Sequence, residues 1–216
     1  MTAPDALASP TAAAPGSRVR RFTRAERVAH WVNAVLFAVT IATGLMFRFG
    51  LGQSLVPDRG IARGVHVYAG FGILVSFGVA MYGRYGAALR QDVRRLGRWS
   101  ADDTRWLRAL GGDRRARLGK FNPGQKLNAT FVAAAAVVLA GSGAIMFWNQ
   151  PFSTNLRVGA NFVHGWFALG VGLSVFGHIL MALRDREALR GITGGTVSAD
   201  WARHHRPAWR AEPADD

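Results

Sequence analysis

The stretch NFVHGWFALGVGLSVFGHILMAL, residues 161–183, decides the fold class of this chain. It contains no Asp, Glu, Lys or Arg, and it is long enough for a transmembrane helix, which needs about 20 mostly apolar residues. It nevertheless carries two histidines, His164 and His178, fourteen residues apart. That spacing is a rise of ~21 Å and a rotation within about 40° of whole turns, so both imidazoles project from nearly the same helix face. One face of this helix could therefore serve two sites stacked along the membrane normal.

Three more apolar stretches of similar length occur earlier in the chain, and the first begins after Thr23 and Glu26, which have the spacing of a helix capping box. We therefore expect four membrane spans, at about residues 25–47, 64–84, 126–148 and 159–183. The predicted fold class is an all-α membrane protein, a four-transmembrane-helix bundle.

The distribution of positive charge predicts the orientation of this bundle. The formal net charge is +14, and 23 of the 27 Lys and Arg lie in residues 1–27, 84–126 and 184–216. By the positive-inside rule, both termini are expected in the cytoplasm (N-in/C-in). Since topology explains the basic excess, no nucleic-acid partner is expected. The absence of cysteine excludes disulfides, Cys-ligated zinc, iron–sulfur clusters held by this chain and covalently attached c-type haem.

Both ends of the chain differ in composition from the spans. Residues 1–17 are rich in Ala, Pro, Ser and Thr and lack a charged region ahead of an apolar core, so we expect a flexible tail and not a signal peptide. Residues 18–190 are expected to form the membrane domain, and residues 191–216 a cytoplasmic C-terminal tail. In that tail, His204 and His205 are expected to be exposed or to face another subunit, and not to bind metal.

The four histidines within the spans fall into two pairs. In the predicted topology His66 and His164 lie on the outer side, and His30 and His178 on the cytoplasmic side. Each pair combines two different helices, and two neutral imidazoles that meet across a helix pair are the arrangement for axial ligation of a b-type haem. Zinc is disfavoured because no Cys, Asp or Glu lies well inside the spans to complete a tetrahedral site.

The span histidines also allow an interpretation without haem. A lone histidine near a helix end can hydrogen-bond a neighbouring carbonyl, and the glycines of the spans could serve plain helix packing as well as the close approach of a macrocycle. The alternative from another class is therefore a haem-free membrane anchor or transporter. No charged residue lies well inside any span, which argues against a transporter.

Several motifs resemble those of one protein family. RFTRAERVAHWVNAVLFAVTIATGLM (residues 21–46), GKFNPGQKLNATF (119–131) and GGTVSADWARHHRPAW (194–209) are similar to the cytochrome b (gamma) subunit of respiratory formate dehydrogenase. The resemblance implies two haem b groups, with His66 and His164 as ligands of the outer one and His30 and His178 as ligands of the inner one.

The resemblance also implies a location in a bacterial inner membrane, a function and partners. Electrons would come from an iron–sulfur (beta) subunit at the outer side and pass through both haems to menaquinone or ubiquinone near the cytoplasm. Asn122, Gly124 and Gln125 are the implied quinone contacts, although the same residues suit a plain helix start. Substrate oxidation would belong to a molybdenum or tungsten (alpha) subunit, and the complex could form a higher-order oligomer. The runner-up is the cytochrome b subunit of a nickel–iron hydrogenase or thiosulfate reductase.

Overall fold

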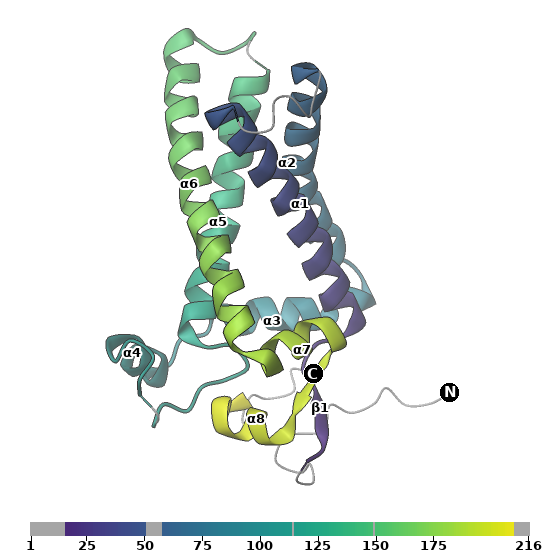
Figure 1. The fold of residues 1–216 in the computed structure, drawn as a ribbon, viewed down its shortest axis with the longest axis vertical. Helices are drawn as coiled ribbons and strands as arrows, with labels where there is room; N and C mark the ends of the chain where they lie inside the picture. Colours follow the sequence, from purple (N-terminus) through teal and green to yellow (C-terminus); the bar gives the residue numbers. More distant parts are fainter. Residues whose placement is uncertain (1–15, 51–57, 114, 149, 210–216) are drawn as a thin grey trace. The chain divides into compact units, whose positions relative to one another are not determined.

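The computed structural model describes residues 16–50, 58–113, 115–148 and 150–209, so the expected N-terminal tail lies outside the described residues except for Gly16 and Ser17. The elements are drawn in Figure 1. In chain order they are β1 (Arg18–Arg20), α1 (Arg24–Phe49), α2 (Arg59–Met81), the 3-10 helix η2 (Arg84–Gly86), α3 (Ala87–Gly97), α4 (Ala101–Arg108), α5 (Pro123–Phe147), α6 (Thr154–Arg184), α7 (Arg186–Gly194), β2 (Thr196–Ser198) and α8 (Ala199–His205).

The chain divides into two compact units. Unit 1 comprises Met1–Arg27, Gly83–Thr130 and Ile179–Asp216, and unit 2 comprises Val28–Tyr82 and Phe131–His178. Unit 2 holds most of the four long helices, and unit 1 holds the short helices and the two strands.

The prediction of four membrane-spanning helices is confirmed. Within the described residues α1, α2, α5 and α6 are long and apolar enough to cross a membrane, and they form the helical bundle of unit 2 (Figure 1). The orientation of the termini stays a prediction.

Several helix boundaries differ from those expected. Helix α5 begins at Pro123 instead of residue 126, α6 begins at Thr154 instead of residue 159, and both ends of α2 differ for local reasons. Helix α2 begins at Arg59 instead of residue 64, because the Asp58 side chain accepts a hydrogen bond from the Gly60 amide (2.6 Å) and caps the helix there. It ends at Met81 instead of residue 84, because Gly83 adopts a φ of 64° that a helix cannot continue. The expected capping box at the start of α1 is present: the Thr23 amide donates to Glu26 (2.6 Å), and the Glu26 amide donates to Thr23 (3.3 Å).

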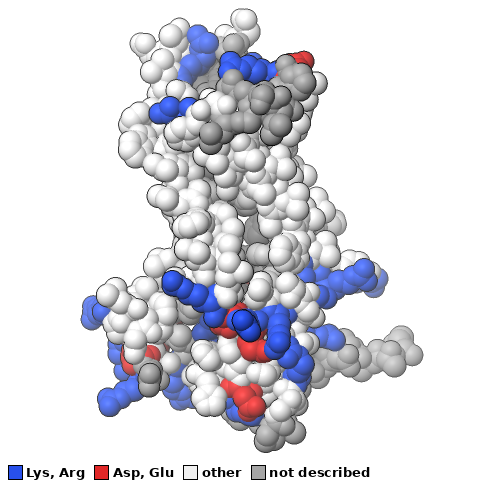
Figure 2. Space-filling view, in the orientation of Figure 1, with Lys and Arg blue, Asp and Glu red and all other residues white. Residues whose placement is uncertain are grey.

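The helices of unit 2 present apolar side chains to the outside. Val79 is 69% exposed, and Leu173 and Phe176 are exposed to a similar degree. Figure 2 shows a largely uncharged surface over these helices, with Lys and Arg gathered mainly over the segments of unit 1. A helix bundle surrounded by lipid is expected to present such an apolar exterior.

A small sheet organises unit 1. Strand β1 pairs antiparallel with β2, with Val19 opposite Val197, and the core beside it contains Ala199, Trp201 and Ala202. Between α7 and β2, Gly195 has a φ of 90°, and a Cβ there would meet the Phe22 carbonyl at 3.0 Å.

This sheet gives the C-terminal segment a definite structure. Residues 191–205, which belong to the expected C-terminal tail, contribute the end of α7, all of β2 and all of α8 to unit 1. The expected domain boundary at residue 190 falls inside α7.

Candidate functional site

The four span histidines meet in two pairs within unit 2. The rings of His30 (α1) and His178 (α6), here the 30/178 pair, have centroids 6.2 Å apart and an interplanar angle of 58°. The rings of His66 (α2) and His164 (α6), here the 66/164 pair, have centroids 6.2 Å apart and an angle of 57°. The structure therefore brings together the same pairs as the topological argument, and the two pairs have nearly the same geometry. Both rings of the 66/164 pair and that of His30 are half-buried, and His178 is exposed.

The separation within each pair suits a metal held between two imidazoles. Two metal–nitrogen bonds of about 2 Å, extended by roughly half a ring on either side, span about 6 Å between ring centres. Within the described residues no group of three or more His, Cys, Asp or Glu could hold a metal ion, so each pair offers two ligands only. Two axial imidazoles are what a b-type haem takes from a protein, because the macrocycle supplies the other iron ligands. The residues present fit haem and do not fit zinc.

Two hydroxyl groups that sequence reasoning missed contact the 66/164 pair. Thr43 Oγ1 lies 2.8 Å from His66 Nδ1, and Ser142 Oγ lies 3.0 Å from His164 Nδ1. The sequence marks these hydroxyl residues only weakly. Each is followed by a glycine, Gly44 or Gly143, and each hydroxyl residue lies near the end of its apolar stretch.

The expected quinone contacts lie in unit 1, at the start of α5. Gln125 Oε1 accepts a hydrogen bond from the Asn122 amide (3.0 Å), and Asn122 Oδ1 accepts one from the Gln125 amide (2.8 Å), with Pro123 at the first helical position. This reciprocal cap uses both side-chain oxygens, and within the described residues neither side-chain NH₂ group has a hydrogen-bond partner. A Cβ on Gly124 would meet the Trp106 ring at 3.8 Å.

A buried cluster of charges, also missed from the sequence, joins three segments of unit 1. Lys120 Nζ lies 2.6 Å from Asp92 Oδ2 and 3.3 Å from Glu26 Oε1, and Arg95 lies 3.1 Å from Asp92. Burial raises the pKa of Asp92 to about 7, against the opposing charge of Lys120 and helped by a hydrogen bond with Glu26. No spacing rule could predict the cluster, since its members come from α1, α3 and the segment before α5.

A second buried feature of unit 1 surrounds Trp201. The guanidinium carbons of Arg21 and Arg206 lie 4.8 Å and 5.3 Å from the centre of its ring. Burial lowers the pKa of Arg21 to about 9, with a contribution from the nearby Arg206, and burial lowers the pKa of Arg206 to about 10. Asp185 opposes both shifts.

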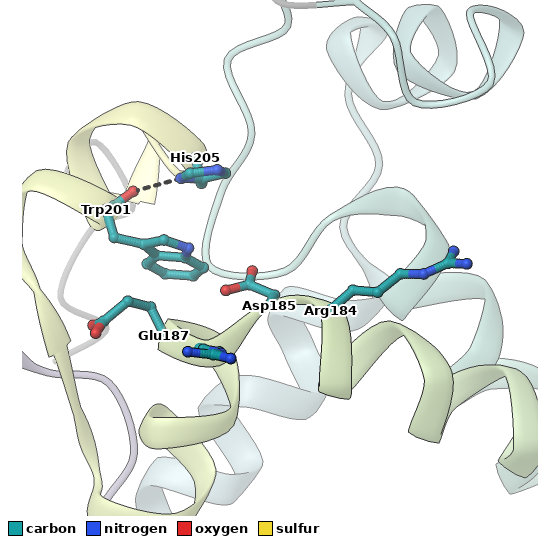
Figure 3. A pocket seen from close by; sticks show the side chains of 6 residues that line it. Arg184, Asp185, Glu187, Trp201 and His205 are labelled. Atoms are coloured by element: carbon teal, nitrogen blue, oxygen red, sulfur yellow. Dashed lines mark hydrogen bonds between the residues drawn. The ribbon is translucent and has the colours of Figure 1, made fainter.

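A hollow of about 470 Å³ opens beside this tryptophan, as Figure 3 shows. Its lining residues are Arg184, Asp185, Arg186, Glu187, Trp201 and His205. The expected haem ligands and quinone contacts are not among them.

The two histidines of the C-terminal segment are exposed, as expected. His204 Nδ1 lies 2.8 Å from the Asp200 carbonyl, and His205 Nδ1 lies 3.1 Å from the Trp201 carbonyl (Figure 3). The His205 ring also stacks on Trp201, with centroids 5.3 Å apart. Local backbone contacts thus account for both rings, and the described residues place no metal-binding group around them.

Comparison with known proteins gives consistent matches. The model of the prokaryotic cytochrome b561 family matches residues 21–195. The formate dehydrogenase cytochrome b556 subunit of Haemophilus influenzae is 30% identical over 91% of this chain and 84% of its own length. Two Escherichia coli subunits are also similar: the formate dehydrogenase cytochrome b556(fdo) subunit is 26% identical over 89% of this chain and 92% of its own length, and the nitrate-inducible cytochrome b556(Fdn) subunit is 25% identical over 87% and 88%.

Proposed function

The chain belongs to the prokaryotic cytochrome b561 family, and on this premise we propose that it carries electrons through two haems to quinone as the membrane subunit of a formate dehydrogenase. The family and the relatives support a multi-pass membrane cytochrome b subunit of formate dehydrogenase. The number of haems, their ligands and the direction of electron flow are the finer parts of the proposal.

One observation carries the proposal of two haems: two histidine pairs, each with a centroid separation of 6.2 Å, join different long helices. His30 and His178 would hold one haem, and His66 and His164 the other. Haem supplies an iron that accepts and releases one electron. The protein would hold the imidazoles on different long helices, with the Trp31 ring beside His30 and the Phe47 ring beside His66. Electrons would pass between the haems without an aqueous path.

The charge distribution supports the proposed orientation. Unit 1 contains residues 1–27, 84–126 and 184–216, which carry 23 of the 27 Lys and Arg. With these segments in the cytoplasm, the 30/178 pair would lie toward the inner side of the bacterial inner membrane and the 66/164 pair toward the outer side. An electron that crosses the membrane in this direction moves charge worth ~2.3 kcal/mol per 100 mV, and quinone that takes its protons from the cytoplasm would add to the membrane potential.

The partners follow from this direction of flow. An iron–sulfur subunit would supply electrons at the outer side, and a molybdenum or tungsten subunit would oxidise formate. Lipid would cover the exposed apolar side chains of unit 2, and the complex could assemble into a higher-order oligomer.

The test is the haem content of the purified chain and of matched histidine variants. We expect b-type bands in the reduced-minus-oxidised spectrum and two haems per folded chain. His164→Ala and His178→Ala should each lose one haem, and the haem that remains should differ between them. His204→Ala, a control in the C-terminal segment, should keep both. A wild-type spectrum without b-type bands would support a haem-free anchor or transporter instead.

The proposed quinone end has its own test, which keeps the helix cap intact. Asn122→Asp and Gln125→Glu retain the cap oxygens but replace the amide NH₂ groups, the donors that a quinone carbonyl would need. We expect both variants to keep two haems that formate still reduces, and to reoxidise these haems with quinone at least tenfold more slowly. Unchanged reoxidation in both variants would place the quinone elsewhere.

Co-purification separates formate dehydrogenase from the runner-up. The named relatives favour formate. A nickel–iron subunit or a thiosulfate reductase catalytic subunit that purified with the chain would identify a different complex.

A further inference from the structure

The two histidine pairs differ in their hydrogen bonding. In the 66/164 pair each ring contacts a hydroxyl through Nδ1, at 2.8 Å for His66 and 3.0 Å for His164. In the 30/178 pair, neither ring has a hydrogen-bond partner in the part of the chain that the structure describes. Two sites with nearly the same ring separation thus have different surroundings.

The proton of the Thr43 hydroxyl already has an acceptor. Thr43 Oγ1 donates to the Val39 carbonyl, 2.7 Å away, which is the usual bond of a helical threonine to the preceding turn. A hydroxyl has one proton to donate and two lone pairs with which to accept. Toward His66, Thr43 therefore acts as an acceptor, so Nδ1 carries the ring proton and Nε2 keeps its lone pair.

The Ser142 hydroxyl repeats this arrangement on another helix. Ser142 Oγ donates to the Val138 carbonyl at 2.7 Å, and it must therefore accept from His164 Nδ1. Helices α1 and α5 thus fix the same tautomer in the rings of α2 and α6. Both rings of the 66/164 pair have Nε2 free to bind a metal.

A glycine after each hydroxyl lets the backbone approach the ring closely. A Cβ on Gly44 would meet His66 Cε1 at 3.6 Å, and a Cβ on Gly143 would meet His164 Cε1 at 3.4 Å. The same dipeptide, a hydroxyl residue followed by glycine, therefore orients both rings, and its appearance on two helices is independent support for one shared role.

We propose that Thr43 and Ser142 are positioning residues that lower the reduction potential of the haem held by the 66/164 pair relative to that of the haem held by the 30/178 pair. A bond accepted from Nδ1–H increases the electron density that the ring gives to the metal. That favours the oxidised iron, which carries the higher charge. This inference rests on the proposed function, because it requires both pairs to ligate haem.

The consequence is a direction for electron transfer. An electron that enters at the 66/164 pair leaves the site of lower potential and reduces the site of higher potential. The hydroxyls would therefore favour transfer from the outer side toward the quinone end.

The experiment is a potentiometric titration of the b-type bands in the intact purified complex. Thr43→Val and Ser142→Ala remove one hydroxyl each. We expect both haems to be retained and the lower of two midpoint potentials to rise in each variant, further in the double variant, with the other midpoint unchanged. The component that moves should be the one that His164→Ala loses. Thr40→Val is the matched control: Thr40 Oγ1 donates to the Phe37 carbonyl at 3.0 Å, and the substitution removes this hydroxyl while keeping the Thr40 backbone, which also contacts His66.

The outcomes are distinct. Unchanged potentials, a fall, or an equal rise of both midpoints would overturn the inference while two haems per chain left the proposed function intact. A wild type without haem would overturn the proposed function itself. If Thr43→Val loses a haem, Thr43→Ser and Ser142→Thr decide: each keeps a hydroxyl, so each should keep the wild-type potential, and a rise in either would contradict the inference.

Discussion

Units 1 and 2 bury opposite kinds of polar side chain. Among the described residues, the buried charged side chains are Arg21, Glu26, Asp92, Asp103, Lys120, Lys126 and Arg206, and all belong to unit 1. In the described part of unit 2, the buried polar side chain is that of Ser142, which is neutral. In unit 1, Glu26, Asp92, Asp103, Lys120 and Lys126 are buried in ion pairs, and Arg21 and Arg206 are buried against the Trp201 ring. A helix in lipid must instead satisfy its polar groups with neutral partners. This difference indicates that unit 1 is suited to water and unit 2 to lipid.

The largest expected effect comes from removing the central cation of unit 1. Lys120→Met leaves Glu26 and Asp92 buried without their shared ammonium group. Breaking a buried ion pair in this way costs about 3–5 kcal/mol. We expect hydrogen exchange at the α3 amides to accelerate accordingly, while the haem content of unit 2 is unchanged. Equal acceleration at the amides of α2 would break the distinction between the units.

An exposed ion pair is the control for this substitution. Arg190 lies 2.6 Å from Glu187, and its side chain is 65% exposed. Exposed pairs contribute about 0–1 kcal/mol. Arg190→Met should therefore leave the hydrogen-exchange rates of unit 1 nearly unchanged. If Arg190→Met accelerated exchange as much as Lys120→Met does, burial would not explain the effect of the lysine.

The same contrast explains what could be predicted from the sequence. The four spans follow from apolar length. The pairing of His30 with His178 and of His66 with His164 follows from topology, because the position of each histidine along its own helix sets the membrane side on which it is expected. The contacts of Lys120 could not be predicted, since Glu26 is 94 positions away in the sequence and Asp92 is 28 positions away. Tertiary contacts of that kind leave no periodic signal in the chain.

The hydroxyl contacts fall between these cases. Thr43 and Ser142 stand in apolar stretches where a hydroxyl commonly bonds its own helix, so the sequence alone predicts no partner on another helix. The glycine after each is the only local sign, and many glycines in such helices serve packing.

An intermediate effect is expected from the titration of Asp92. Burial raises its pKa to about 7 from 3.8, so between pH 3.8 and about 7 the folded protein holds a proton that the unfolded chain has released. The free energy of unfolding should then fall as pH rises through this window, because the native state binds more protons. Asp92→Asn should reduce this slope, as judged by hydrogen exchange of α3 across the window. Lys120, Glu26 and Arg95, which face the carboxyl, remain in the variant.

Exposed Asp200 is the control for that measurement. Asp200→Asn should leave the slope between pH 3.8 and about 7 unchanged. A slope that persists in Asp92→Asn would assign the proton to another group of the buried cluster.

The smallest effect comes from one substitution made in both units. Val197 is fully buried in unit 1, opposite Val19, whereas Val79 in unit 2 is 69% exposed. Val197→Ala removes buried methyl groups and leaves a cavity, which should cost about 2 kcal/mol and accelerate exchange at the β1–β2 amides. Val79→Ala removes side-chain surface that is mostly exposed, so it should cost less than about 0.5 kcal/mol in detergent. A comparable loss of stability at both positions would mean that protein, and not lipid or detergent, covers Val79. The two units would then not differ in solvent at that face of α2.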